Sequence, residues 1–206
     1  MADSGTVLVL DIDGVVALSH AGGPQPWSAN LEQDWGFDAD EMGRDFFSRD
    51  WLEVVRGRLD LFVALQDFLV PRGLGDRLEE FAQYWFEHDS VIDRELLADV
   101  AAWRQRTGAR VFAATNQEHH RVAWLSENAG LGAHFDEIIY SAALGVCKPD
   151  RVFFTNAQAR MGVQNSRSIL FVDDSPANVD AARALGWRSV LYRGRQSLAG
   201  VLAQVD

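Results

Sequence analysis

Three short apolar runs constrain the fold of this chain most strongly, because each lacks a polar face and each ends at polar side chains. They span residues 6–10, 109–114 and 168–172. Short runs without alternation are typical of strands that are buried on both faces, as in a parallel sheet. Two weaker runs, residues 138–140 and 190–192, repeat the pattern. The sequence therefore predicts a sheet of parallel strands.

Amphipathic stretches with apolar residues at spacings of three and four separate these runs. They span residues 94–106, 118–128, 152–161 and 177–185. A glycine lies just past each stretch, where helix C-termini commonly place one. Strands that alternate with helices indicate an α/β fold with right-handed crossovers. We therefore predict a Rossmann-like core of three layers, with helices on both faces of the sheet.

Residues 16–92 interrupt this rhythm. Segments 38–47, 59–69 and 76–87 predict helices, and no strand-like run lies among them. We expect a small helical cap domain, inserted into a catalytic core made of residues 1–15 and 93–206. The insert holds 12 of the 22 aromatic residues of the chain. We interpret them as the hydrophobic core of a small unit and not as an aromatic substrate box.

Composition excludes several classes of function. The formal net charge is −11, and residues 28–95 alone carry 17 acidic and 7 basic side chains, so we expect no nucleic-acid partner. A single cysteine excludes an internal disulfide and a metal site built from cysteines.

No apolar run approaches the roughly 20 residues of a membrane span. The N-terminus lacks the basic start of a secretory signal. We expect a cytoplasmic protein without a membrane partner.

Polar side chains gather where the predicted strands end. Asp11 and Asp13 follow the first run, Thr115 and Asn116 follow the second, and Asp173 and Asp174 follow the last long one. In an open parallel sheet, ligands bind outside the carboxyl ends of the strands. The only lysine of the chain, Lys148, precedes a proline in the loop between the second and last of these sites. We therefore expect all these side chains to share one site.

Several carboxylates at one sheet edge repel one another, and their burial without partners is costly. A divalent cation resolves this conflict. Oxygen ligands without nearby histidine or cysteine select Mg²⁺, which commonly takes a substrate phosphate as a further ligand. One carboxylate can then attack phosphorus while its neighbour acts as general acid and base. The expected partner is a small phosphorylated molecule.

The chain resembles the haloacid dehalogenase superfamily, a group of Mg²⁺-dependent phosphatases with an aspartate nucleophile. Four segments carry the resemblance, in order along the core: residues 11–15 (DIDGV), 115–116 (TN), 148–150 (KPD) and 173–178 (DDSPAN). The helical insert between the first two resembles the cap of the subfamily whose cap lies at that point. Two departures are mild and leave the catalytic groups intact: Val15 and Val16 replace the usual threonine and leucine, and Asn178 stands where many members have aspartate.

The resemblance implies a role for each residue. Asp11 would form an aspartyl-phosphate, and Asp13 would protonate the leaving oxygen and later activate water. The Mg²⁺ ligands would be Asp11, the backbone carbonyl of Asp13, and Asp174, with Asp173 beside the ion in the first or second shell. Thr115, the N–H of Asn116, and Lys148 would bind phosphate oxygens. Asn178 would orient either the fourth-motif loop or Lys148.

The implied activity is a phosphatase for a small metabolite, such as a sugar phosphate. A phosphomutase, or a binding or regulatory protein that has lost turnover, are the alternatives; Asp13 disfavours a dehalogenase, which needs no proton on its leaving group. Monomer and homodimer both remain open. Substrate choice is expected to belong to the cap and its entrance. The candidates for substrate contacts are His20, Trp27, Arg49, Arg56, Arg58, Gln117, His119 and His120. A plain surface role remains open for the arginines, and a solvated helix start remains open for Gln117, His119 and His120.

Overall fold

Five parallel strands form the centre of the computed structural model, which describes residues 5–18, 27–194 and 196–204. The strand order is β3-β2-β1-β4-β5, so the first strand of the chain lies in the middle. The strands are β1 (Val7–Leu10), β2 (Arg110–Thr115), β3 (Glu137–Tyr140), β4 (Ile169–Asp173) and β5 (Arg188–Leu191). The predicted parallel sheet is confirmed. The ends of each predicted strand differ from those of an observed strand by at most two residues.

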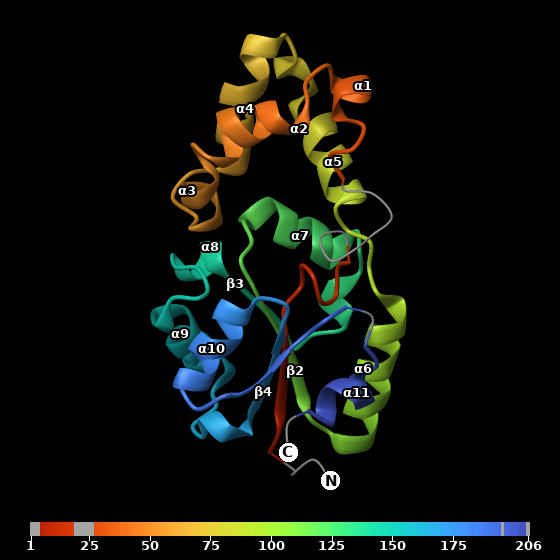
Figure 1. The fold of residues 1–206 in the computed structure, drawn as a ribbon, viewed down its shortest axis with the longest axis vertical. Helices are drawn as coiled ribbons and strands as arrows, with labels where there is room; N and C mark the ends of the chain where they lie inside the picture. The colour runs from red at the N-terminus through yellow and green to blue at the C-terminus, as the bar shows by residue number, and fades with distance from the viewer. Residues whose placement is uncertain (1–4, 19–26, 195, 205–206) are drawn as a thin grey trace.

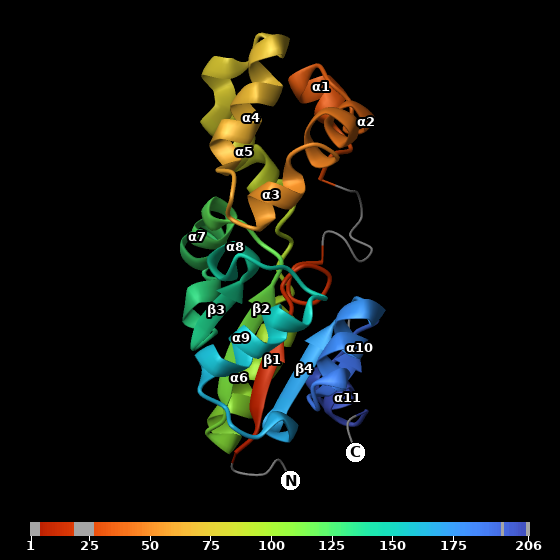
Figure 2. The same cartoon turned by 90° about the vertical axis from the view of Figure 1, so that its left-hand side faces the viewer.

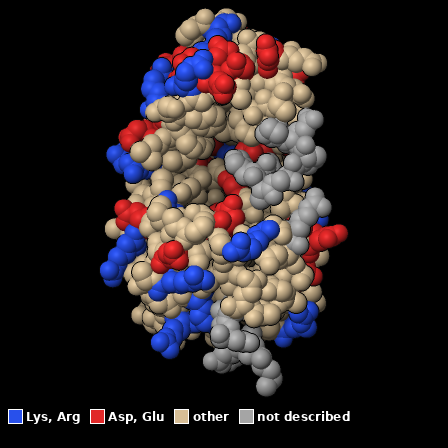
Figure 3. All heavy atoms as spheres, viewed as in Figure 1, with Lys and Arg blue, Asp and Glu red and all other residues tan. Residues whose placement is uncertain are grey.

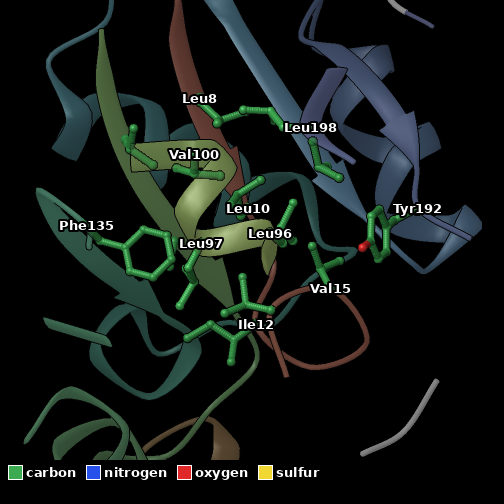
Figure 4. Packing of buried hydrophobic residues seen from close by; sticks show 14 of the residues in the cluster. Leu8, Leu10, Ile12, Val15, Leu96, Leu97, Val100, Phe135, Tyr192 and Leu198 are labelled. Carbon is green, nitrogen blue, oxygen red and sulfur yellow. The ribbon is translucent and has the colours of Figure 1, made fainter. Parts of the chain in front are cut away.

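Helices cover both faces of the sheet (Figures 1 and 2). Leu8 and Leu10 of β1 join one hydrophobic cluster, which Figure 4 shows in close-up. Val7 and Val9 point to the opposite face and join a second cluster, because successive side chains of a strand alternate. The first cluster is completed by α6 (Arg94–Thr107), α7 (His119–Glu127) and α11 (Leu198–Leu202). The second is completed by α9 (Arg151–Met161) and α10 (Pro176–Ala184). The three-layer α/β/α core is thereby confirmed.

The inserted segment is helical, as predicted, and lies beyond the carboxyl ends of the strands (Figure 1). Its elements are α1 (Leu31–Trp35), α2 (Ala39–Met42), a π-helical turn (Gly43–Phe47), α3 (Trp51–Val55), α4 (Leu61–Leu69), two 3-10 turns (Val70–Arg72 and Gly75–Arg77) and α5 (Leu78–His88). The helix predicted over residues 38–47 is thus divided into α2 and a π-helical turn. Two helices of five residues, α1 and α3, were not predicted.

The insert has a hydrophobic cluster of its own, built largely from aromatic side chains. Trp85 is buried in it and stacks on Trp27 with ring centroids 5.2 Å apart. Trp35 is also buried, and Trp51 packs against the cluster from its edge. The interpretation of these aromatic residues as the hydrophobic core of the insert is confirmed.

The two connections between insert and sheet run side by side. Ala17 pairs with Ile92 in an isolated bridge, and the amide of Leu18 donates to the carbonyl of Val91 at 2.9 Å. The amide of Asp93 donates to the carbonyl of Val16 at 2.8 Å. The chain therefore leaves the core and returns to it at adjacent points, close to residues 16 and 92. The division into domains at these two positions remains a prediction.

In the described part of the chain, no helix combines the length and the apolar character needed to cross a membrane.

Candidate active site

The carboxyl ends of β1, β2 and β4 open into a cavity of about 220 Å³. Seven residues line it: Asp11, Asp13, Thr115, Asn116, Lys148, Asp174 and Asn178. These are residues that the sequence singled out, now drawn from four separate segments of the chain. Figure 3 shows a hollow between the insert and the core, with charged side chains inside it. The predicted convergence at one sheet edge is therefore found in the structure.

Lys148 is the positive centre of this cluster, and its side chain is 1% exposed. Its Nζ lies 2.8 Å from Oδ2 of Asp11 and 2.7 Å from Oδ2 of Asp173. It also donates to the carbonyl of Ala114 on β2 at 2.8 Å. The three N–H bonds of the ammonium therefore have three acceptors. Burial alone would lower the pKa of Lys148, but the carboxylates of Asp11 and Asp173 outweigh it and raise that pKa.

Two asparagines hold this arrangement in place. The side chain of Asn116 donates to the carbonyl of Lys148 at 3.0 Å and accepts from its amide at 2.8 Å. Asn178 donates to both carboxylate oxygens of Asp173 at 3.0 and 3.1 Å. Asn178 therefore holds the carboxylate of Asp173, which in turn contacts Lys148. The family resemblance implies a role only for the backbone N–H of Asn116, so the contacts of its side chain with Lys148 are a finding of the structure.

Three carboxylates converge tightly enough to hold a metal ion. One oxygen each from Asp11, Asp173 and Asp174 lies within 4.8 Å of the others. Burial raises the pKa of Asp11 well above its ordinary value, with Lys148 opposing and Asp173 adding to the effect. Burial and the charge of Asp173 raise the pKa of Asp174. This donor set fits Mg²⁺, a hard cation that would relieve the repulsion among the carboxylates.

Gly14 allows the loop after β1 to pass directly beside Asp174. A Cβ at this position would lie 2.1 Å from Oδ2 of Asp174. The residue also has a φ of 80°, a conformation that side chains with a Cβ rarely adopt. A glycine is therefore required for Asp13 and Asp174 to line the same cavity.

We expect Mg²⁺ to raise the melting temperature of the wild type by several degrees, because a ligand at 100 times its Kd stabilises a fold by about 2.7 kcal/mol. Asp174→Asn should abolish this shift. The raised pKa of Asp174 means that its charge destabilises the metal-free fold once the pH exceeds the unfolded pKa of about 3.9. In EDTA at neutral pH, the variant should therefore be at least as stable as the wild type.

The control for this thermal-shift measurement is Asp180→Asn, which removes an exposed carboxylate paired with Arg183 on α10. This variant should keep the full Mg²⁺ shift. An equal Mg²⁺ shift in Asp174→Asn and in the wild type would show that Asp174 does not hold the ion.

Asp13 is restrained by two residues of the segment that follows β2. Gln117 donates from Nε2 to one carboxylate oxygen of Asp13, and Arg121 donates from Nη2 to the other at 3.0 Å. Gln117 is buried, so its side chain lies at the site and not at a solvated helix start. Arg121 was not predicted. A signal existed, because Arg121 lies four residues before the buried Leu125 and so on the buried face of α7.

Among the residues that the structure describes, the remaining specificity candidates do not line the cavity. His20 lies outside the described residues. Arg49 pairs with Asp50, and Arg56 and Arg58 pair with Glu53, so each of these arginines contacts a carboxylate of the insert.

Trp27 belongs to the aromatic cluster of the insert. His120 joins the insert to the core, because its Nε2 lies 2.8 Å from Oδ2 of Asp60 and its ring stacks on Phe62. His119 is exposed and contacts the hydroxyl of Tyr140 at 3.2 Å.

Comparison with known sequences supports the family resemblance that the four motifs carry. The family model of haloacid dehalogenase-like hydrolases matches residues 6–186, a range that contains all four motifs. The GMP/IMP nucleotidase YrfG of Escherichia coli K12 is 33% identical over 85 residues, which are 41% of this chain and 38% of that protein. The drimenol cyclase drtB of Aspergillus calidoustus is 35% identical over 71 residues, 34% of this chain and 13% of that protein. The matches therefore span well under half of these curated relatives.

Solved structures share the whole fold at low sequence identity. A haloacid dehalogenase family enzyme from Bacteroides thetaiotaomicron, in complex with magnesium and inorganic phosphate, superposes with a TM-score of 0.79 at 16% identity, covering 94% of this chain and 97% of that one. The L-2-haloacid dehalogenase of Xanthobacter autotrophicus gives a TM-score of 0.65 at 21% identity, covering 97% and 81%. The motifs, the fold and the matched range together place this chain in the haloacid dehalogenase-like hydrolase family.

Proposed function

We propose that this protein is a Mg²⁺-dependent phosphatase that hydrolyses small phosphorylated metabolites through an aspartyl-phosphate at Asp11. The observation that carries the proposal is the cluster around Lys148, in which a buried carboxylate of Asp11 lies 2.8 Å from the ammonium. A nucleophile needs a defined position and a counter-charge that favours its ionised form. Lys148 supplies both for Asp11.

Asp11, Asp173 and Asp174 are the side chains that would hold Mg²⁺, together with the backbone carbonyl of Asp13. When bound, the ion supplies positive charge that offsets the charge of the phosphate. Thr115 and the amide of Asn116 end β2 beside the same cavity and would hold phosphate oxygens. The ammonium of Lys148 adds positive charge to this pocket. Its N–H groups donate to the carboxylates of Asp11 and Asp173 and to the carbonyl of Ala114.

Two proton transfers belong to Asp13 in this proposal. In the first step, an oxygen of Asp11 forms a bond to phosphorus while the bond to the ester oxygen breaks, and Asp13 gives that oxygen its proton. In the second step, Asp13 takes a proton from water as the water oxygen attacks phosphorus and Asp11 leaves. Asp11 and Asp13 line the same cavity, as both steps require. The retained Asp13 favours phosphate transfer over dehalogenation.

We propose that the helical insert, residues 16–92, is the cap that closes this cavity. Its paired connections at Ala17 and Ile92 leave the core directly after the loop that carries Asp13. Sugar phosphates are the first substrate class to test. The 33% identical segment of a GMP/IMP nucleotidase supports purine nucleoside monophosphates as a second class.

The test is hydrolysis of p-nitrophenyl phosphate with Mg²⁺ and with EDTA, followed by a panel of sugar phosphates and nucleoside monophosphates. We expect turnover that requires Mg²⁺ and a preference within the panel. Phosphomutase activity would appear as transfer of phosphate within a bisphosphate, without release of inorganic phosphate. No turnover of any ester with Mg²⁺ present would favour a binding or regulatory protein and contradict the proposal.

A further inference from the structure

A fully enclosed arginine lies behind the site, on the helix that follows β2. Arg121 is 3% exposed, and its guanidinium lies between two carboxylates. Nη2 contacts Oδ1 of Asp13 at 3.0 Å, and Nη1 contacts Oδ2 of Asp89 at 3.0 Å. A buried charge is costly unless its partners are close and well oriented, so removal of one partner disturbs the others.

On one side, this arginine fixes the carboxylate of Asp13. One oxygen of Asp13 accepts from Arg121 and the other accepts from the buried Gln117. Both donors belong to the segment that follows β2. Rotation of the Asp13 carboxylate would therefore break at least one hydrogen bond.

On the other side, Arg121 is anchored at the base of the insert. Asp89 directly follows α5, at the start of the connection that returns to the core. Its backbone carbonyl accepts from Nη2 of Arg121 at 2.8 Å, in addition to the contact of its carboxylate. The carboxylate also accepts from Nε1 of Trp85 in the hydrophobic cluster of the insert, at 3.4 Å. The guanidinium thus joins the end of the insert to Asp13.

We propose that Arg121 is a positioning residue for Asp13 and that Asp89 locates Arg121. This inference rests on the proposed function, in which Asp13 gives a proton to the leaving oxygen. The planar guanidinium of Arg121 holds the carboxylate of Asp13 in one orientation. A carboxylate held in this way needs little reorganisation before it transfers that proton. Arg121 itself does not touch the reacting atoms in this account.

The test uses the dependence of kcat/KM on the leaving group. Basic leaving groups such as alkoxides need the proton of Asp13, whereas p-nitrophenolate needs it little. We expect Arg121→Met to lower kcat/KM for an alkyl phosphate by about 100-fold, since misplaced catalytic groups cost this much. The loss for p-nitrophenyl phosphate should be several times smaller. Arg121→Lys should lose less kcat/KM for the alkyl phosphate than Arg121→Met does, because it keeps a positive charge beside Asp13.

Asp89→Asn is also expected to lower kcat/KM more for the alkyl phosphate than for p-nitrophenyl phosphate. The double variant Asp89→Asn/Arg121→Met should have the same kcat/KM values as Arg121→Met alone, because both changes act through the same contact. The control is Arg104→Met, which removes the ion pair between Arg104 and Asp136. This pair lies near the start of β2, at the amino-terminal ends of the strands and away from the site. This control should keep the wild-type profile. If Arg121→Met does not fold by circular dichroism, Arg121→Lys and Asp89→Asn carry the test.

An equal loss of kcat/KM for every ester would show that Arg121 only supports the fold, and an unchanged profile would show that it does not act on Asp13. A wild-type profile in Asp89→Asn would overturn the role of Asp89. Failure of the proposed function has a different signature, because the wild type would then hydrolyse none of the esters.

Discussion

Asp11→Asn is expected to lower kcat/KM for phosphate esters by at least about 10⁴-fold, as loss of a covalent nucleophile commonly does. The amide is a poor nucleophile but is almost the same size as the carboxylate. Lys148 keeps its contacts to Asp173 and to the carbonyl of Ala114, so the variant should fold. Steady-state kinetics with p-nitrophenyl phosphate, beside a melting curve, measures both properties.

The matched control for Asp11→Asn is again Asp180→Asn, the same chemical change at an exposed position. It should leave kcat/KM unchanged. Turnover of Asp11→Asn close to that of the wild type would contradict a nucleophilic role for Asp11.

Lys148→Arg is expected to lower kcat by about 100-fold or more while the protein remains folded, because misplaced groups in an active site have effects of this size. The ammonium is a compact charge with three acceptors around it, and its side chain is 1% exposed. A guanidinium is planar and wider, so it does not reproduce three contacts in this space. Some loss of stability from overpacking is expected as well, about 1–3 kcal/mol.

The control for Lys148→Arg is Arg160→Lys, the reverse exchange at an exposed ion pair with Glu137. Arg160→Lys should keep wild-type kcat and a similar melting temperature. Near-normal kcat in Lys148→Arg would show that the only lysine of the chain has no special role in the site.

The strands and most site residues were predictable because their signals are local. A buried parallel strand is a short apolar run, and the residues at its end face the ligand. Asp11, Thr115 and Asp173 each stand at such an end, so their convergence follows from the order of strands in a sheet. The long helices α6 and α9 were likewise visible from their apolar spacing and the glycine that follows each.

The features that escaped prediction depend on contacts distant in sequence. The spacing of α7 indicates that Arg121 is buried, but it does not identify its partners: Arg121 contacts Asp13 across 108 positions and Asp89 across 32. Helices α1 and α3 have five residues each, too few to show a helical period. The π-helical turn at residues 43–47 carries Phe46, which is fully buried in the aromatic cluster, and such tertiary contacts are not visible in a local pattern.

The covalent step on Asp11 is the central claim, and a direct test is to trap the phosphorylated protein. Asp13→Asn with p-nitrophenyl phosphate is suited to this, because the good leaving group departs without an acid whereas hydrolysis of the aspartyl-phosphate lacks its base. Acid quenching followed by mass spectrometry of peptides should show one phosphoryl group on the peptide that contains Asp11. A burst of p-nitrophenol without protein-bound phosphate, or phosphate on another residue, would contradict this account.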